Sequence, residues 1–184
     1  MSSGSWGDDA MWRQAVAGDR KAFSALVELL QPRIRRLLYR LQGFRGEVDD
    51  QTQEVFLRLM AALPSIRDLT RAGGFVCSIA ANVSREESRR RRGVETVIEP
   101  ADPALEPDRK VQQGETAEQV RRAIRALPET LRETLVLATY EGLSPTQIGE
   151  VLKVDAGAIR HRLFRARSQL KAALQSTLFQ EVSR

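Results

Sequence analysis

The side chains best suited to chemistry with a polyanion are the bases of one segment near the C-terminus. Five bases recur there, while Asp and Glu are absent from residue 156 to residue 179: Arg160, Arg162, Arg165, Arg167 and Lys171. Guanidinium groups neutralise phosphates and release their counterions, and arginine can donate two hydrogen bonds to one guanine edge in the major groove. An isolated helix of this kind is more often a solvated surface, so its interpretation depends on the elements before it.

A capped turn precedes the basic segment and predicts a helix-turn-helix. Ser144 supplies an N-cap hydroxyl and Pro145 suits the first helical position, which predicts a short helix over residues 145–152. Asp155 can cap the longer helix that carries the bases. Short helix, tight turn and long basic helix form the arrangement that places a recognition helix in the major groove. This context favours nucleic-acid binding.

The remaining residues offer little for catalysis or metal binding. The chain has one histidine, His161, and one cysteine, Cys77, so neither a zinc cluster nor an internal disulfide is expected. Cys77 lies in an apolar stretch, which predicts a buried, inert thiol. Asp49 and Asp50 are neighbours that would point about 100° apart on a helix, and no phosphate-binding glycine loop or nucleophile elbow occurs. We expect no enzyme acting alone, and no cofactor, metal ion or small-molecule substrate.

The composition predicts an all-α fold. Of the 184 residues 42% are hydrophobic and only 5% aromatic, and the abundant Leu, Ala and Arg favour helices. Apolar spacing predicts a helix around residues 23–41, which Pro32 should kink or divide, a second before Pro64 with Met60 on its apolar face, and a third over 74–92. No apolar run approaches the roughly 20 residues that span a bilayer, and the start is acidic. We expect a soluble, intracellular protein.

Charge divides the chain into three segments. Residues 1–93 hold 16 bases and 11 acids, residues 94–115 hold 2 bases and 6 acids, and residues 116–184 hold 11 bases and 7 acids. The middle segment also repeats proline, which removes backbone donors and opposes a helix. We therefore predict two small helical domains, residues 12–93 and 116–179, joined by a flexible acidic, proline-rich linker over residues 94–115. The helix-turn-helix belongs to the second domain.

Several stretches resemble bacterial sigma factors of the small two-domain extracytoplasmic function (ECF) group. Residues 127–137 (LPETLRETLVL), 141–144 (EGLS) and 157–167 (GAIRHRLFRAR) resemble the C-terminal domain of sigma factors. Residues 49–59 (DDQTQEVFLRL) look like the polymerase-binding helix of that group, and residues 78–82 (SIAAN) like the start of its promoter-opening helix. The resemblance covers roughly residues 12–92 and 116–175, in the correct order across a linker.

The resemblance implies a cytoplasmic bacterial protein that binds core RNA polymerase and directs it to particular promoters, while polymerase performs the chemistry. The implied contacts with the −35 element are Arg160, His161, Arg162, Phe164 and Arg165. The implied contacts with the −10 element are Asn82, Arg85 and Arg89, with the loop over residues 64–73 capturing an unstacked base. The implied contacts with core polymerase are Asp50, Gln53 and Glu54. Many members are inhibited by an anti-sigma factor, which makes one a candidate partner here.

The chain departs from the family pattern at the turn of the helix-turn-helix. Lys153 stands where glycine is usual, so a left-handed residue there would cost about 1 kcal/mol or the turn would be reshaped. Two other functions remain open. A stand-alone helix-turn-helix regulator would not need the segment at residues 49–59 that resembles a polymerase-binding helix. A sigma mimic that sequesters an anti-sigma factor would not need the arginine-rich recognition helix.

Overall fold

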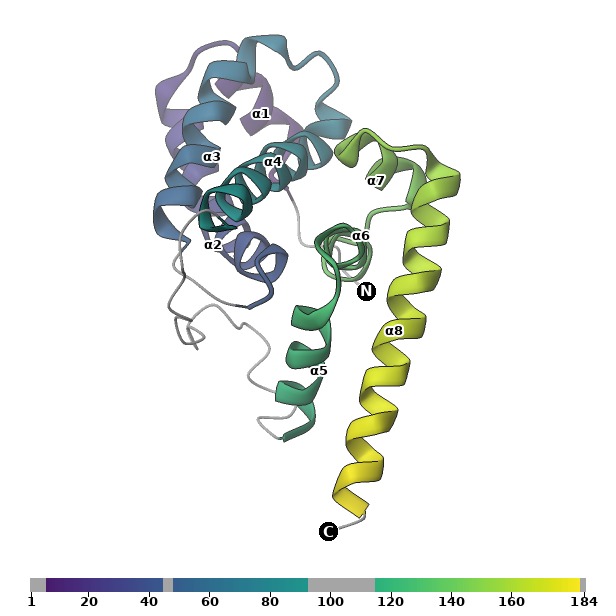
Figure 1. Cartoon of the computed structure of the whole chain (residues 1–184). Coiled ribbons are helices and arrows are strands. Elements are labelled where there is room, and N and C mark those ends of the chain that lie inside the picture. Colours follow the sequence, from purple (N-terminus) through teal and green to yellow (C-terminus); the bar gives the residue numbers. More distant parts are fainter. Residues whose placement is uncertain (1–5, 45–47, 93–114, 183–184) are drawn as a thin grey trace.

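The computed structural model describes residues 6–44, 48–92 and 115–182, and every regular element in these ranges is a helix. Eight α-helices and two short 3-10 helices follow one another along the described chain (Figure 1). The expected all-α fold is confirmed. The linker predicted at residues 94–115 lies outside the described residues, apart from Glu115, which begins helix α5.

The N-terminal helices are α1 (Asp9–Val16), α2 (Arg20–Leu41), α3 (Asp49–Ala62) and α4 (Ala72–Arg92). The 3-10 helices η1 (Leu63–Ser65) and η2 (Leu69–Arg71) connect α3 to α4. Aspartates cap the first two helices, since the amide of Met11 donates to Asp8 at 2.7 Å and that of Lys21 to Asp19 at 2.8 Å. These helices enclose a core that includes Trp12, Leu30, Leu37, Leu59 and Val76.

Helix α2 runs without interruption through Pro32, so the division that the sequence allowed there does not occur. An interior proline removes one backbone hydrogen bond and costs about 3 kcal/mol in a free helix. Here the apolar residues Leu30, Ile34 and Leu37, which flank the proline on both sides, are completely buried. Burial of their side chains outweighs the local preference and keeps the helix continuous.

The C-terminal helices are α5 (Glu115–Ala126), α6 (Glu129–Thr139), α7 (Pro145–Leu152) and α8 (Ala156–Val182). The predicted helix-turn-helix is confirmed in α7 and α8. Ser144 and Gln147 form a capping box at the start of α7, and Lys153 adopts the left-handed conformation with φ 55° and ψ 48°. A side chain at Gly149 would lie 2.6 Å from the carbonyl oxygen of Val154, so this tight turn requires glycine in α7.

The N-terminal and C-terminal helices pack against each other. Helix α7 contacts the first turns of α4, and α6 contacts α2, as Figure 1 shows near its centre. Buried apolar side chains of both sets form one continuous cluster, which includes Val76 and Ala80 from α4 and Val151 from α7. None of the described helices combines the length and the apolar character needed to cross a membrane.

Candidate functional site

Helix α8 presents a basic face to solvent on its first turns. Arg160, His161, Phe164 and Arg165 are all exposed, and their spacing puts them on one side of the helix. Ile159, Leu163 and Ala166 on the opposite side are buried against α6 and α7. Arg162 lies at the border and is half-buried. The exposed face can therefore approach a nucleic acid without disturbing the packing that holds the helix.

The exposed face of α8 is not purely ionic. Phe164 is 70% exposed, which is unusual for a large apolar side chain and suits contact with a thymine methyl group. The start of the helix is fixed by Asp155, whose carboxylate accepts the amide of Gly157 at 2.7 Å and that of Ala158 at 3.3 Å. Recognition helices of this motif contact base edges with their N-terminal residues. The Asp155 cap holds the first turn of α8 in place for such contacts.

Helix α4 carries the three side chains that the family resemblance assigned to the −10 element, and they lie in different surroundings. Arg89 is exposed, whereas Asn82 and Arg85 are half-buried. Arg85 donates to both carboxylate oxygens of Glu133 in α6, at 2.8 and 3.2 Å, and also to the Asn82 side chain at 3.3 Å. Part of the polar edge that the sequence predicted on α4 is therefore covered by a C-terminal helix.

Two buried carboxylates anchor the contact between the N-terminal and C-terminal helices. Glu133 is 3% exposed, and burial raises the pKa of its carboxyl although the Arg85 guanidinium acts in the opposite direction. The side chain of Glu141 is 2% exposed and pairs with Arg33 of α2 at 2.8 Å. Removing one partner of such a pair leaves an uncompensated buried charge, which costs about 3–5 kcal/mol. Neither pair follows from the local sequence pattern.

Helix α3 supplies the candidate protein-binding surface. Asp50 and Gln53 are exposed, as expected for contact residues. Glu54 is less available, because its carboxylate accepts a hydrogen bond from Arg58 at 2.7 Å. Arg58 also donates to both oxygens of Glu86 in α4, at 2.8 and 2.7 Å, and these carboxylates raise the pKa of the Arg58 guanidinium. Glu54 thus belongs to a network that joins α3 to α4.

An apolar groove of about 430 Å³ lies beside these polar residues, between α2 and α3. Its lining includes Leu57 and Met60, which are 57% and 52% exposed. The sequence places Met60 on one apolar face with Val55 and Leu59, but in the structure those two side chains are buried while Met60 is exposed. Spacing could have revealed this surface: Asp50, Gln53, Leu57 and Met60 follow one another at intervals of three and four residues, which places them on one face.

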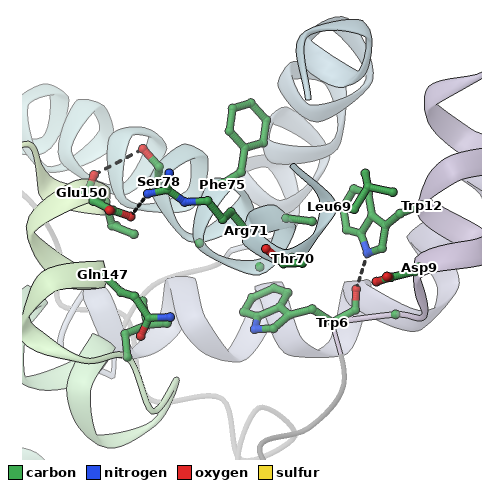
Figure 2. Close-up of a pocket in the computed structure, with 16 residues that line it drawn as sticks. Trp6, Asp9, Trp12, Leu69, Thr70, Arg71, Phe75, Ser78, Gln147 and Glu150 are labelled. Carbon is green, nitrogen blue, oxygen red and sulfur yellow. Dashed lines mark hydrogen bonds and ion pairs between the residues drawn. The ribbon is translucent and has the colours of Figure 1, made fainter. Parts of the chain in front are cut away.

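A second crevice, of about 440 Å³, lies where η2 and the start of α4 face α7 (Figure 2). The indole of Trp6 covers Gly73, where an added Cβ would clash with the ring. Arg71 pairs with Glu150 of α7, and the Ser78 hydroxyl donates to the carbonyl oxygen of Val151 at 3.3 Å. The loop expected to capture an unstacked base therefore borders a crevice that the C-terminal helices help to enclose.

Comparison with known proteins gives matches in both parts of the chain. A family model described as sigma-70 region 2 matches residues 26–94, and one described as sigma-70, region 4 matches residues 117–170. The RNA polymerase sigma-H factor of Pseudomonas aeruginosa is 32% identical, over 93% of this chain and 95% of that protein. The ECF RNA polymerase sigma factor SigW of Bacillus subtilis is 25% identical, over 89% and 94%.

Two solved structures share the fold over most of their length. The sigma factor RpoE in complex with the anti-sigma factor NepR from Bartonella quintana has a TM-score of 0.71 and 21% identity, with 84% of this chain and 98% of that chain covered. CnrH in complex with the cytosolic domain of CnrY has a TM-score of 0.64 and 22% identity, with 91% and 96% covered. At these identities the likeness concerns the arrangement of helices.

Proposed function

We propose, on the premise that the chain belongs to the extracytoplasmic function group of bacterial sigma-70 factors, that α3 binds core RNA polymerase while α4 and α8 contact promoter DNA. The chain is an RNA polymerase sigma factor, which directs promoter-specific transcription initiation. The observation that carries the DNA-binding assignment is the exposed basic face of α8 on a capped helix-turn-helix. Bond-forming chemistry then belongs to polymerase, so the chain acts as a specificity subunit and not as an enzyme, in the cytoplasm.

Two domains divide this work. The first, residues 12–93, holds α3 and α4 and takes the polymerase-binding and −10 roles. The second, residues 116–179, holds the helix-turn-helix and takes the −35 role, with residues 94–115 as the linker. The grouping of exposed residues supports this division, since Asp50 and Gln53 lie on α3 and Arg160 and Arg165 on α8. An anti-sigma factor is a candidate partner, because both similar structures contain a second protein and one is named an anti-sigma factor.

The −10 role combines two kinds of contact. Asn82 can donate and accept at a base edge, whereas Arg85 and Arg89 only donate, mostly to phosphate. The loop over residues 64–73 borders the crevice of Figure 2, whose wall contains Trp6 and Phe75. An unstacked base gains about 1–3 kcal/mol from stacking on an aromatic side chain. These features support capture of a melted strand near the start of α4.

Transcription with purified core polymerase on a randomised promoter library tests the proposal and identifies the promoter. We expect transcripts that need the chain and share two sequence blocks separated by a fixed spacing. Core polymerase without the chain, on the same library, is the control. DNA binding without transcripts that depend on the chain would favour the stand-alone regulator. Failure to bind DNA with or without polymerase would favour the sigma mimic.

Sequence preference at the −35 element should depend on Arg165. Replacing Arg165 with Ala should cost about 1–3 kcal/mol at one base pair and relax the preference there. Arg167, which is also exposed, is the matched control, because two residues along an α-helix turn its side chain about 200° around the axis from that of Arg165. Arg167→Ala should weaken binding evenly across sequences. Selection of bound duplexes from a random pool measures both, and an unchanged preference in Arg165→Ala would refute the assignment.

A further inference from the structure

We propose that the free chain locks itself closed: two buried ion pairs join its domains, and this closure covers the part of α4 that faces the −10 strand. The closure stands on the contacts between the domains. The statement about the −10 strand rests on the function proposed above for Asn82 and Arg85.

The first ion pair occupies the group that DNA would need. Glu133 accepts two hydrogen bonds from Arg85, at 2.8 and 3.2 Å, in the bidentate geometry that a phosphate also offers to arginine. The two partners are 48 residues apart and belong to different domains. Because Glu133 is almost completely buried, Arg85 cannot turn to a nucleic acid while the pair is intact. The acidic side chain and the DNA backbone therefore compete for one guanidinium.

The second ion pair ties three segments together. Arg33 of α2 donates to Glu141, which follows α6, and the two residues are 108 positions apart. The guanidinium carbon of Arg33 also lies 3.7 Å from the ring centre of Trp6, over the face of the indole. Trp6 in turn covers Gly73 at the start of α4. Glu141 thus connects the second domain to the segment that borders the strand-capturing loop.

Hydrogen bonds from arginine side chains to backbone carbonyls complete the closure at the other end of α2. The side chain of Arg132 donates to the carbonyl oxygen of Leu41 at 2.9 Å, and that of Arg125 donates to the carbonyl oxygen of Gly43 at 2.9 Å. Carbonyl groups at the C-terminus of a helix have no partner within the helix. The second domain supplies those partners, so separation of the domains would return these carbonyls to water.

Closure affects the two DNA-contacting surfaces differently. Arg160 and Arg165 on α8 stay exposed in the closed chain, whereas Asn82 and Arg85 on α4 are half-buried. The closed chain can therefore meet duplex DNA through α8 but not a melted strand through α4. Buried ion pairs add little net stability but are costly to leave half-broken, which makes such contacts suitable for a two-state switch. Binding of core polymerase would supply the free energy for opening.

The distance between the domains tests the closure directly. Cysteines introduced at Ala61 on α3 and Gln169 on α8, both exposed, can carry a donor and an acceptor dye. Cys77 should escape labelling, because it is buried and burial raises its pKa. Single-molecule energy transfer on the full chain then reports the closed and open populations. We expect the parent protein to be mainly closed and core polymerase to lengthen the distance.

Charge reversal identifies the lock. Glu133→Arg should lower the ratio of closed to open molecules by at least about tenfold, because it opposes two like charges in a buried site. Adding Arg85→Glu to this variant should restore closure, which also shows that the variant folds. The matched control is Glu86→Arg, which breaks a bidentate pair with Arg58 inside the first domain and should leave the distance unchanged. An open parent protein, or equal distances in Glu133→Arg and the parent, would overturn the closure.

Binding of a randomised single-stranded DNA pool tests what the closure covers. Glu133→Gln and Glu86→Gln each remove one negative charge, but only the first weakens the lock. We expect Glu133→Gln to bind the pool several-fold more tightly than Glu86→Gln. Equal binding of the two variants, together with an opened Glu133→Arg, would overturn the covering of the −10 surface and the role proposed for Arg85. Failure of the whole chain to bind core polymerase would instead contradict the proposed function and leave the distance result unaffected.

Discussion

Replacing Met60 with aspartate should weaken binding of core polymerase by at least about 2 kcal/mol, the size of effect found at the centre of a protein interface. Met60 is 52% exposed and lines the apolar groove between α2 and α3. A charge there would have to be desolvated when a partner helix or loop fills the groove. Affinity of purified core polymerase for the labelled chain, measured by fluorescence anisotropy, gives the effect.

Leu29 provides the matched control for this substitution. It is 46% exposed and lies on α2, but it does not line the groove. Leu29→Asp introduces the same charge at an equally accessible apolar position and should leave the affinity within a factor of about two, since exposed substitutions outside an interface change little. Equal losses in Leu29→Asp and Met60→Asp would show that a general charge effect, and not the groove, controls binding.

Asp50→Arg should act on the same surface through its polar rim. Gln53 lines the groove, and Asp50 lies one turn before it on the same exposed face of α3. Rim charges steer association and change its salt dependence more than they change the final affinity. Met60→Asp should therefore mainly accelerate dissociation, whereas Asp50→Arg should mainly slow association at low salt.

Local rules were sufficient to predict the helix-turn-helix. The cap at Ser144, the proline after it and the cap at Asp155 each act within a few residues. The left-handed Lys153 appeared where the family pattern predicted an unusual backbone, although the residue there is not glycine. The basic face of α8 follows from spacing, because the buried residues on its other side fix the rotation of the helix.

Two features lay beyond local rules for different physical reasons. Helical periodicity places Met60 on an apolar face but does not say whether the fold or a partner covers that side chain. The contacts of Arg33 with Glu141 and Arg85 with Glu133 span 108 and 48 residues. The sequence around Arg85 does not indicate whether its guanidinium binds a carboxylate of the chain or a phosphate of DNA.

Asn82→Ala should impair promoter opening while leaving the closed promoter complex nearly intact. The amide side chain can recognise a base edge, and removal of one such interaction costs about 1–3 kcal/mol. Permanganate footprinting of unpaired thymines should show reduced opening on duplex templates. Templates already melted across the −10 region should restore activity, because the strand is then available without the interaction that favours its separation.

The arginines near the end of α4 should affect binding to every template, whereas Asn82 should affect only opening. Arg89 and Arg90 are exposed, beyond the region that Glu133 covers. Replacing both with glutamine should weaken binding on duplex and melted templates alike, and reduce the slope of log affinity against log salt by about 0.7–0.9 for each phosphate that is no longer neutralised.

Full opening of duplex promoters by Asn82→Ala would mean that α4 does not read the melted strand. If Asn82→Ala also had the same interdomain energy transfer as the parent protein, the covering of Asn82 in the closed chain would have no role in selecting the −10 strand.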